Sequence, residues 1–504
     1  MATAPDTADA SAESDGGTYD VVIIGAGISG IGAAYHLGRR SRRTSYVVLE
    51  RRERIGGTWD LFRYPGVRSD SSIFTLSWPW EPWTGQDWVA DGDVIRDYVE
   101  NTARKHGIYP HIRFGTHVHS ADWDSATDTW TLHVTRDGKS VRYRSRFVFF
   151  GTGYYNYDEP YSPDFPGIES FRGRVVHAQL WPDDLDYTGK RAVVIGSGAT
   201  AVSMVPALAR RAAHVTMLQR SPGYLFSMPR RNPIPQPVRN LLPAKVSYRI
   251  VRMLGLMFEK IVWIFSRGLP SGMKKVVRWQ NAKYLPAGYP VERDFKPRYN
   301  PWDERMCLVA DGDLFEEIRR GALEVVTDNI DHVDETGIAC RSGRHLDADI
   351  IVKATGLVLQ ALGGIRVSVN GVEVKPQERF SYKAHMLDDV PNLFWCIGYT
   401  NASWTLRADM TARAATKLLD YMDDHGYTHA YPHLGSGPIP EKPTWDLQAG
   451  YVRRSPHALP KSGVKRPWTV RQDFLADAID FRLLDRIDED MVFGRVAAPA
   501  QLTR

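Results

Sequence analysis

The feature that most constrains this chain is a pair of glycine fingerprints, each placed directly after a short apolar segment. The first is Gly25-Ala-Gly27-Ile-Ser-Gly30, and the second is Gly196-Ser-Gly198-Ala-Thr-Ala201. A G-x-G-x-x-G/A sequence between a buried strand and a helix is typical of a unit that binds the pyrophosphate of a dinucleotide. Two such units in 504 residues predict an α/β protein with two Rossmann-like dinucleotide-binding domains.

The first fingerprint belongs to a complete strand–turn–helix–strand unit. Residues 19–24 are a short apolar run that predicts a buried parallel strand. After it, Gly25 is expected to form the tight turn, Gly27 to let the backbone approach a pyrophosphate, and Gly30 to let the helix pack closely on the strand. The next predicted strand ends in Glu50, an acid that can accept a hydrogen bond from a ribose hydroxyl. The unit therefore predicts a site for FAD or NAD.

The second fingerprint has the same order of elements but a different ending. A predicted strand over 191–195 precedes it, and alanine is an accepted variant at its third position. The next predicted strand ends in Arg220 and Ser221, where the first unit has an acid. An arginine and a hydroxyl can hold a 2′-phosphate that a carboxylate would repel, so we expect NADPH here; a solvent-facing loop is the alternative. The residues expected to hold it are Gly196, Gly198, Thr200 and Arg220.

Charge and cysteine content exclude several classes of protein. A net charge of +5 gives no case for nucleic-acid binding, which needs a concentrated basic face. Three isolated cysteines argue against a disulfide framework, and no apolar run is long enough to span a bilayer, so a cytoplasmic location is expected. Residues 1–18 lack the features of a signal peptide. His117 and His119 lie two apart without further ligands nearby, so no metal site is expected.

A third motif lies between the two fingerprints, over residues 171–182. Its pattern F-x-G-x-x-x-H-x-x-x-W-P is made by Phe171, Gly173, His177, Trp181 and Pro182. This pattern resembles the signature of Baeyer–Villiger monooxygenases, class B flavoprotein enzymes that insert one oxygen atom of O2 beside a ketone carbonyl. The segments 56–66, 153–159 and 398–406 resemble an actinobacterial subgroup of that family, the one that includes the ethionamide-activating monooxygenase.

The resemblance implies roles for individual residues. It implies FAD at the first fingerprint, with the segment after it lying along this cofactor through Gly57, Thr58, Trp59 and Tyr64. It implies that Arg305 is a catalytic residue that stabilises developing negative charge, and that Asp70 is a catalytic residue that orients Arg305. Trp468 matches a short family segment that reaches NADP. His177 and Trp181 of the signature are implied to couple movements of the two domains.

One position departs from the pattern of the family. Many members have lysine directly before the catalytic arginine, and this chain has Glu304 there. The departure leaves the role of Arg305 intact, but it places more of the phosphate binding on Arg220.

The order of the motifs predicts that each nucleotide domain is built from two separate pieces of chain. The expected boundaries are a disordered tail over 1–18, FAD-binding parts over 19–155 and 383–504, NADPH-binding parts over 156–222 and 303–382, and a helical insertion over 223–302. Within the insertion, residues 246–265 predict a strongly apolar helix with interspersed basic residues. Its interpretations are packing within a helical subdomain, a lid over the substrate, and a weak contact with a membrane surface.

The aromatic stretch 76–83 has two interpretations, a packed core loop or part of the wall of an apolar substrate pocket. The expected activity is NADPH- and O2-dependent oxidation of a small ketone to an ester or lactone, with thioethers as further substrates. Rival hypotheses are a nitrogen- or sulfur-oxidising flavin monooxygenase, a disulfide reductase and a non-catalytic NADPH-binding sensor. Trp181 argues against the nitrogen- or sulfur-oxidising enzyme, and the absence of a cysteine pair argues against the disulfide reductase. The presence of both Arg305 and Asp70 argues against the non-catalytic sensor. The sequence does not indicate the ketone, its migrating side or the oligomeric state.

Overall fold

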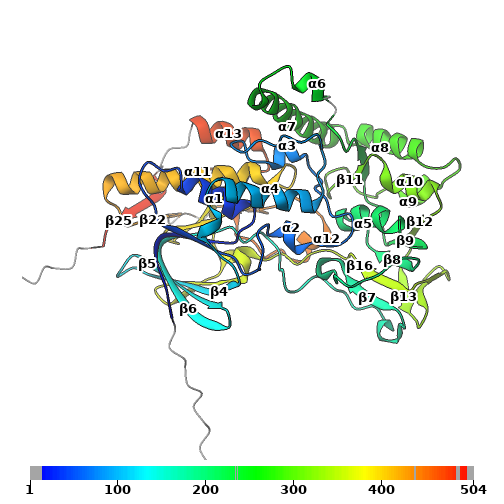
Figure 1. Cartoon of the computed structure of the whole chain (residues 1–504), viewed down its shortest axis with the longest axis horizontal. Helices are drawn as coiled ribbons and strands as arrows, with labels where there is room; N and C mark the ends of the chain where they lie inside the picture. Colours follow the sequence, from blue (N-terminus) through cyan, green and yellow to red (C-terminus); the bar gives the residue numbers. More distant parts are fainter. Residues whose placement is uncertain are drawn as a thin grey trace, which may run out of the picture.

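The computed structural model describes residues 14–496, except 233, 235, 436, 438 and 484–488. Two sheets organise the chain, and each carries one of the glycine fingerprints (Figure 1). Helices pack on both sheets, and a further group of helices lies at the upper right of Figure 1. The α/β class with two dinucleotide-type units and a helical insertion is thereby confirmed.

The larger sheet has nine strands in the order β18-β17-β4-β5-β6-β1-β2-β3, with β21 also paired to β6. Its strands are β1 (Ser14–Ile24), β2 (Tyr46–Leu49), β3 (Ile112–Arg113), β4 (Thr116–Asp124), β5 (Thr129–Arg136), β6 (Lys139–Phe150), β17 (Arg366–Val369), β18 (Val372–Val374) and β21 (Leu393–Trp395). The part that carries the fingerprint is parallel, whereas β4, β5 and β6 form an antiparallel meander. Asp137 and Gly138 both have positive φ in the hairpin between β5 and β6, as a tight primed turn requires.

The smaller sheet has five parallel strands in the order β12-β9-β8-β16-β7. They are β7 (Arg174–His177), β8 (Arg191–Ile195), β9 (His214–Gln219), β12 (Leu323–Thr327) and β16 (Ile350–Lys353). Helix α5 (Ala199–Ala209) follows the second fingerprint, and α10 (Asp313–Arg319) packs beside α5. The signature motif forms β7 at the edge of this sheet, next to β16.

Two expected boundaries differ from the structure. Strand β1 begins at Ser14, so residues 14–18 are part of the sheet and not of a tail; residues 1–13 lie outside the described part. The chain also returns to the larger sheet earlier than expected, because β17 pairs with β4 and β18 pairs with β17. Residues 366–382 therefore lie with the first nucleotide unit, and no apolar or glycine motif in this short stretch could have revealed that pairing.

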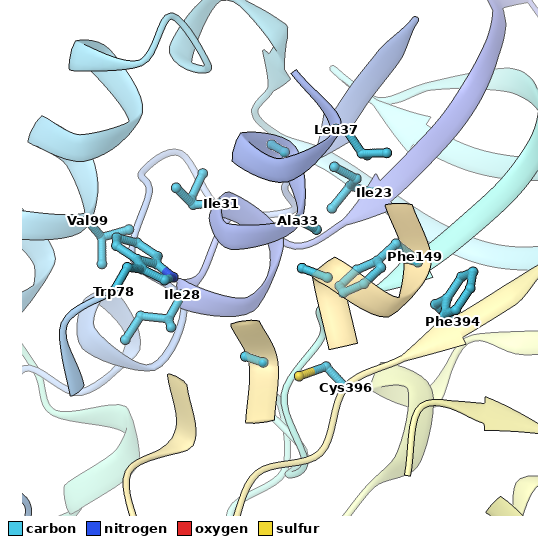
Figure 2. Close-up of a cluster of buried hydrophobic side chains, with 14 of the residues drawn as sticks. Ile23, Ile28, Ile31, Ala33, Leu37, Trp78, Val99, Phe149, Phe394 and Cys396 are labelled. Carbon is cyan, nitrogen blue, oxygen red and sulfur yellow. The ribbon is translucent and has the colours of Figure 1, made fainter. Parts of the chain in front are cut away.

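Helix α1 (Ile28–Leu37) is buried between the larger sheet, α4 (Gly92–Lys105) and α11 (Trp404–His425). Figure 2 shows Ile31 and Ile28 of α1 on the side of Trp78, with Ile23 and Phe149 of the sheet on the other side of the helix. Small residues on α1 permit this closeness: a Cβ at Gly32 would lie 3.0 Å from Nε1 of Trp78.

The aromatic stretch 76–83 belongs to this core. Trp78 has no exposed surface, and Trp80 stacks on Tyr35 with ring centroids 3.5 Å apart. Of this stretch only Leu76 lines the cleft described below. The interpretation as a packed core loop is therefore correct for the tryptophans. The sequence alone could not distinguish it from a pocket wall, because it does not reveal what the tryptophans pack against.

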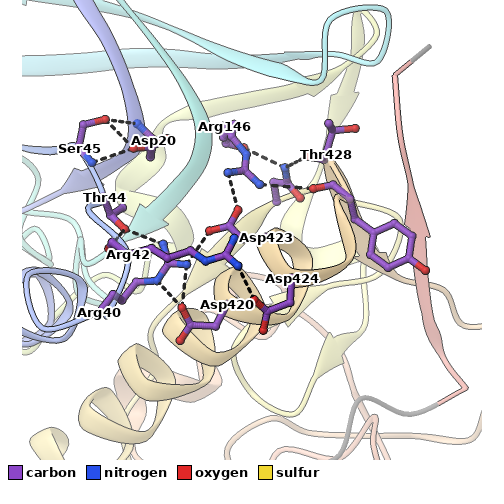
Figure 3. A network of polar contacts seen from close by, with 12 residues as sticks. Asp20, Arg40, Arg42, Thr44, Ser45, Arg146, Asp420, Asp423, Asp424 and Thr428 are labelled. Carbon is purple, nitrogen blue, oxygen red and sulfur yellow. Dashed lines mark hydrogen bonds and ion pairs between the residues drawn. The ribbon is translucent and has the colours of Figure 1, made fainter. Parts of the chain in front are cut away.

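The C-terminal end of α11 is tied to the first part of the chain by ion pairs (Figure 3). Arg40, after α1, contacts Asp420 at 2.9 Å and Asp423 at 2.7 Å, and Arg146 of β6 contacts Asp423 at 2.9 Å. The side chain of Arg40 is only 3% exposed, and each of its charged nitrogens needs such a partner. Segments nearly 400 residues apart in sequence thus form one unit.

The insertion is dominated by α7 (Ala244–Gly268) and α8 (Pro270–Tyr284), together with the short helices α6 (Gln236–Arg239) and α9 (Val291–Asp294). Strand β10 (Leu225–Met228) pairs with β11 (Cys307–Ala310) and closes the base of the insertion. Helix α7 packs on α3 (Ile73–Leu76) of the first unit. Among the residues that the structure describes, no helix is long and apolar enough to cross a membrane.

Candidate functional site

A cleft of about 320 Å³ runs along the carboxyl ends of the parallel strands of the larger sheet and reaches the N-terminus of α5. Its lining includes most of the residues expected at the first cofactor, and also two groups from elsewhere in the chain, Thr200 of the second unit and Arg305. The expected residues that line it are Gly25, Gly27, Glu50, Gly57, Thr58, Trp59, Tyr64, Asp70, Thr200 and Arg305. Ligand sites in open α/β sheets occur at this strand edge.

The first fingerprint has the geometry that a pyrophosphate site needs. Gly25 has a φ of +98°, and a Cβ there would lie 2.8 Å from the carbonyl oxygen of Gly151. A Cβ at Gly30 would lie 1.9 Å from the carbonyl oxygen of Gly25, so only glycine lets the helix pack this closely. Gly27 faces Gly57 across the cleft, and α1 begins at Gly27 without a side-chain cap. The helix N-terminus therefore offers its N–H groups to an anion.

Glu50 closes one end of the cleft and is almost fully buried. Its Oε2 accepts a hydrogen bond from the backbone N–H of Ala26 at 2.7 Å, and its Oε1 accepts one from Arg52 at 2.9 Å. Burial raises the pKa of this carboxyl, against the lowering effect of those two bonds. Each carboxylate oxygen keeps further lone-pair capacity for a ligand in the cleft. His117 also lines the cleft. In the sequence this residue stands out only as a candidate metal ligand, which does not predict its place in the cleft.

Hydroxyl groups line the middle of the cleft. Tyr155 donates a hydrogen bond to Oγ1 of Thr58 at 2.8 Å, and the hydroxyl of Tyr157 lies 3.5 Å from the same atom. Tyr64 connects the two units, because its hydroxyl lies 3.4 Å from Oγ of Ser203 on α5. The glycine cradle, the uncapped helix and the acid at the strand end together fit a dinucleotide.

Arg305 and Asp70 meet in the cleft, 235 positions apart in sequence. Nη1 of Arg305 lies 3.3 Å from Oδ2 of Asp70, and their side chains are 30% and 42% exposed. Nε of Arg305 is buried and has no hydrogen-bond partner among the described residues. Tyr451 and Tyr154, with Asp70, raise the pKa of the guanidinium, so its positive charge is permanent. The pair presents a fixed cation to whatever occupies the cleft.

The N-terminus of α11 forms the opposite wall. Trp404 stacks on Tyr154 with ring centroids 5.0 Å apart, and its Nε1 donates a hydrogen bond to Oγ of Ser29 on α1 at 2.8 Å. A Cβ at Gly398 would lie 2.2 Å from the Trp404 ring, so the approach of this helix depends on glycine. Helix α11 therefore borders the cleft through Trp404 and the residue before it, Ser403.

A chain of hydroxyl groups leads from the cleft to helix α7. Ser71 lines the cleft, and Ser403 donates a hydrogen bond to it at 2.9 Å. Ser403 also lies 2.6 Å from Oγ1 of Thr75, which donates to Oε1 of Glu259 on α7 at 3.1 Å. Burial raises the pKa of Glu259 to about 7. These contacts place α7 one layer of side chains behind the cleft.

The second fingerprint repeats the geometry of the first. Gly196 has a φ of +145°, and a Cβ there would lie 2.3 Å from the carbonyl oxygen of Ala354. Ala201 is fully buried, and α5 begins at Gly198 without a side-chain cap. Gly198 faces open space, because no atom lies within 4 Å of a Cβ built there. The start of α5, at Ala199 and Thr200, reaches the cleft, and so does Leu357 from the segment after β16.

Arg220 and Ser221 are both exposed at the end of β9. The positive charge of Arg220 has a lowering effect on the pKa of two groups from other segments, Glu304 and Arg454. Burial raises the pKa of Glu304, whereas burial and the nearby Arg220 lower the pKa of Arg454. The guanidinium of Arg454 lies over the ring of Tyr161, 3.5 Å from its centroid. Arg454 therefore adds a positive charge beside Arg220 that no sequence motif indicated.

The signature motif lies outside the cleft. Phe171 is buried in the core of the smaller sheet, and a Cβ at Gly173 would lie 2.3 Å from the carbonyl oxygen of Asp349. Trp181 packs partly buried against the same unit. His177 accepts a hydrogen bond from the Gln179 backbone through Nδ1, so its Nε2 carries the hydrogen and donates to the Tyr161 carbonyl oxygen at 3.2 Å.

Burial lowers the pKa of His177, in agreement with this neutral tautomer. The guanidinium of Arg454 packs on the ring of the same Tyr161. Tyr161 therefore contacts both His177 and Arg454 and links the signature histidine to the arginines of the second unit. Trp468 has a different place: it is 3% exposed in the core beside Tyr382 and does not line the cleft.

Comparison with known proteins agrees with this geometry. A family profile described as flavin-binding monooxygenase-like matches residues 85–362, and one described as an NAD(P)-binding Rossmann-like domain matches residues 23–85. The FAD-containing monooxygenase EthA of Mycobacterium tuberculosis is 47% identical over 481 residues, which cover 95% of this chain and 98% of that protein. The probable FAD-binding monooxygenase AlmA of Acinetobacter baylyi is 41% identical over 461 residues, with 91% and 92% covered.

Solved structures show the same architecture. A steroid monooxygenase bound to NADP superposes with a TM-score of 0.75 at 23% identity, covering 95% of this chain and all of that one. A cyclohexanone monooxygenase from Rhodococcus sp. Phi1 bound to NADP+ superposes with a TM-score of 0.74 at 20% identity, covering 95% and 99%. At these identities the likeness concerns the fold, which is that of a chain with two dinucleotide-binding units.

Proposed function

Because this chain belongs to the flavin-binding monooxygenase-like family, we propose that it is an FAD- and NADPH-dependent Baeyer–Villiger monooxygenase. In the proposed reaction one atom of O2 enters the bond between a ketone carbonyl carbon and its neighbour, which gives an ester or lactone. The other atom leaves as water, with two electrons and a proton from NADPH and one proton from solvent. Thioethers are proposed as further substrates. The predicted cytoplasmic location remains a prediction.

The observation that carries the proposal is the meeting of Arg305 and Asp70 in a cleft that both nucleotide units line. Gly27 of the first unit and Thr200 of the second lie in its wall, so one ligand in the cleft is within reach of the other unit. A cation with a free N–H at this meeting point is suited to a reaction that develops negative charge on oxygen.

Each cofactor has residues that would hold it. FAD would lie along Gly25, Gly27 and Gly57, with its ribose at Glu50 and with Trp404 over its far end. When bound, FAD takes up the electrons of NADPH and activates O2 for transfer. NADPH would lie on the second fingerprint, with its 2′-phosphate at Arg220. The similarity to EthA, an FAD-containing monooxygenase, and to a steroid monooxygenase bound to NADP supports this pairing.

Arg305 is proposed to stabilise the negative charge that develops on oxygen in the cleft. Its charge is permanent, and the Asp70 contact at 3.3 Å holds the guanidinium in place while Nε stays available. A preorganised donor of this kind typically lowers a barrier by about 3–4 kcal/mol. Asp70 is then a positioning residue that also limits how far the positive charge of Arg305 extends.

The test is product analysis by mass spectrometry with NADPH, ¹⁸O2 and a panel of cyclic ketones, long-chain ketones and thioethers. We expect an ester or lactone that carries one ¹⁸O atom, with the second label in water. Labelled sulfoxide without any ester would identify a heteroatom-oxidising enzyme instead. NADPH consumption that yields only hydrogen peroxide across the whole panel, with no labelled organic product, would count against Baeyer–Villiger activity. No NADPH consumption at all would favour the non-catalytic sensor.

A further inference from the structure

The outer face of helix α7 is apolar although it is exposed. Large apolar side chains recur on it every three or four residues, and Leu254 and Ile261 are 50% and 58% exposed. The others that the spacing aligns with them include Ile250, Met253, Met257 and Ile264. On a helix this spacing forms a single stripe. Among the described residues the large exposed apolar side chains concentrate here, and scattered ones elsewhere are ordinary.

The stripe cannot turn inward, because polar contacts fix the rotation of α7. Nη1 of Arg252 donates hydrogen bonds to the carbonyl oxygens of Phe74 and Ser77, both at 2.6 Å. One turn later a Cβ at Gly255 would lie 3.1 Å from Trp88, so the helix backbone lies directly on the first unit. The inner face is therefore anchored, and the outer stripe is a fixed property of the surface.

Basic residues accompany the stripe. The two helices over 244–284 contain nine lysine and arginine residues against one acid, Glu259, whereas the whole chain has a net charge of only +5. Glu259 is turned inward to Thr75. Lys245 and Arg249 are exposed and have no ion-pair partner among the described residues. They align with Lys260 and Arg267 at separations of 4, 11 and 7 residues, which places all four in one row along the helix. Lys260 pairs with Asp473 and Arg267 with Asp303, so Lys245 and Arg249 supply most of the uncompensated charge of this row.

Helix α8 also carries an exposed aromatic residue. Trp279 is 66% exposed, and Nζ of Lys283 lies 5.6 Å from its ring centroid. Amphipathic rings beside lysine are favoured at the boundary between lipid headgroups and acyl chains. The helices α7 and α8 thus present an apolar stripe, a basic edge and an exposed tryptophan on one hairpin. In Figure 1 α7 lies at the upper border of the molecule.

We propose that the helical hairpin 244–284 docks in the plane of an anionic lipid bilayer, with the α7 stripe among the acyl chains and the basic row at the headgroups. Surface helices of this composition bind lipid through buried apolar area plus attraction to anionic headgroups. The helices do not span the bilayer, in keeping with the absence of a spanning helix in the described part of the chain. A second copy of this chain fits less well, because a symmetric contact would bring two strongly basic hairpins together.

The proposal rests in part on the proposed function, since it names a source of substrate. The hydroxyl chain of Thr75, Ser403 and Ser71 links Glu259 on the inner face of α7 to the cleft. An apolar ketone or thioether dissolved in the bilayer would therefore be delivered close to the site. Lipid binding itself needs no turnover, so its test stands apart from that of the oxygenation reaction.

The experiment is sedimentation of the FAD-loaded full chain with vesicles of phosphatidylcholine alone or with about one-third phosphatidylglycerol. We expect binding to the mixed vesicles that weakens as salt is raised and is much weaker on phosphatidylcholine. The triple variant L254S/M257S/I261S should lose at least about tenfold in apparent affinity. The variant K245E/R249E should lose affinity for the mixed vesicles only. That result would show that the apolar stripe needs the basic residues beside it to bind anionic lipid.

The matched control replaces exposed apolar residues elsewhere, as V372S/V464S, and should bind like the parent chain. Retained FAD and an unchanged rate of NADPH oxidation in solution show that a variant is folded. The proposal is overturned if the parent chain stays in the supernatant with mixed vesicles, or if the triple variant binds as well as the control. It is also overturned if ultracentrifugation shows a dimer that the triple variant abolishes while no variant binds vesicles.

Discussion

At the scale of single residues, the proposed reaction assigns the stabilisation of negative charge to the guanidinium of Arg305. Replacing Arg305 by alanine removes the fixed cation from the cleft and leaves Asp70 unpaired. We expect ester formation to fall by at least about 10²-fold, the equivalent of 3–4 kcal/mol of barrier, while NADPH oxidation remains measurable. The measurement is the ratio of ester formed to NADPH consumed.

The control for this variant is Arg267→Ala, which removes an arginine that pairs with Asp303 on the insertion. That change should leave the ratio of ester to NADPH unaltered. A normal ratio in the Arg305→Ala enzyme would mean that the charge is supplied by another group.

Under the proposed function, two arginines and one acid govern the choice between NADPH and NADH. Arg220 and Arg454 would face a 2′-phosphate together, and Glu304 opposes it. We expect R220Q and R454Q each to raise the KM for NADPH at least about tenfold and to leave the KM for NADH within about twofold, because NADH lacks the phosphate. E304Q should lower the KM for NADPH. Steady-state kinetics with both nucleotides provides the measurement, and equal effects on both would refute the assignment.

The contrast between Arg305 and Arg454 shows how far single residues can be predicted from sequence. Arg305 follows a family pattern, so its pairing with Asp70 was expected before any geometry was known. Arg454 has no motif, and its place beside Arg220 results from packing on Tyr161. The contacts of Ser403 with Ser71 and of Tyr155 with Thr58 could not be predicted either, because they join segments far apart in the sequence.

At the scale of elements, the two strand–turn–helix units should respond differently to added methyl groups. Gly30→Ala would drive a Cβ into the Gly25 carbonyl, so we expect a loss of at least about 2 kcal/mol in unfolding free energy together with loss of bound FAD. Gly198→Ala enters open space and should change the unfolding free energy by less than about 0.5 kcal/mol. It should nevertheless raise the KM for NADPH, since the methyl group occupies the approach of the pyrophosphate.

Denaturant titration and the FAD absorbance of the purified variants check both statements. Equal destabilisation by the two substitutions would mean that the second unit is packed as closely as the first.

A buried carboxyl on the inner face of helix α7, that of Glu259, makes the unfolding free energy depend on pH. Burial raises the pKa of Glu259 from 4.5 to about 7, although Thr75 and Arg252 lower it. Between these two values the unfolded chain loses its proton before the folded one does, so stability falls as pH rises from about 4.5 to 7 and stays low above that. Glu259→Gln should remove this slope and stabilise the protein at pH 8 by up to about 3 kcal/mol.

The measurement is the difference in unfolding free energy between Glu259→Gln and the parent chain at pH 5, 6, 7 and 8. A difference that does not change with pH would show that Glu259 is already ionised in the folded protein.

At the scale of the whole molecule, the FAD cleft unites segments from both nucleotide units and from the C-terminal half of the chain. A ligand that binds only the folded state stabilises it by mass action, which amounts to about 2.7 kcal/mol at 100 times Kd. Removing FAD should therefore lower Tm, and adding free FAD should restore it in a concentration-dependent way. Calorimetry with NAD+ added in place of FAD is the control. An unchanged Tm after FAD removal would contradict the assignment of the cleft.

The architecture as a whole followed from two short motifs, because a strand, three glycines and a helix specify a local unit that needs little context. The boundaries were harder, since β17 joins the larger sheet through backbone pairing with β4 that leaves no residue pattern. The aromatic stretch 76–83 had two interpretations for the same reason: a buried tryptophan and a pocket tryptophan have the same sequence.

The pairing of β21 with β6, and of α11 with α1, also has a consequence for synthesis on the ribosome. After the last residue of α1, about 390 residues must still be translated before α11 is complete, which takes roughly 20–80 s at 5–20 residues per second. Until β21 emerges, β6 lacks this neighbour, whereas the smaller sheet has all its strands once β16 ends at Lys353. The nascent first unit is thus an open sheet waiting for its last strand and helix, and the flavin can be retained only when translation is nearly finished.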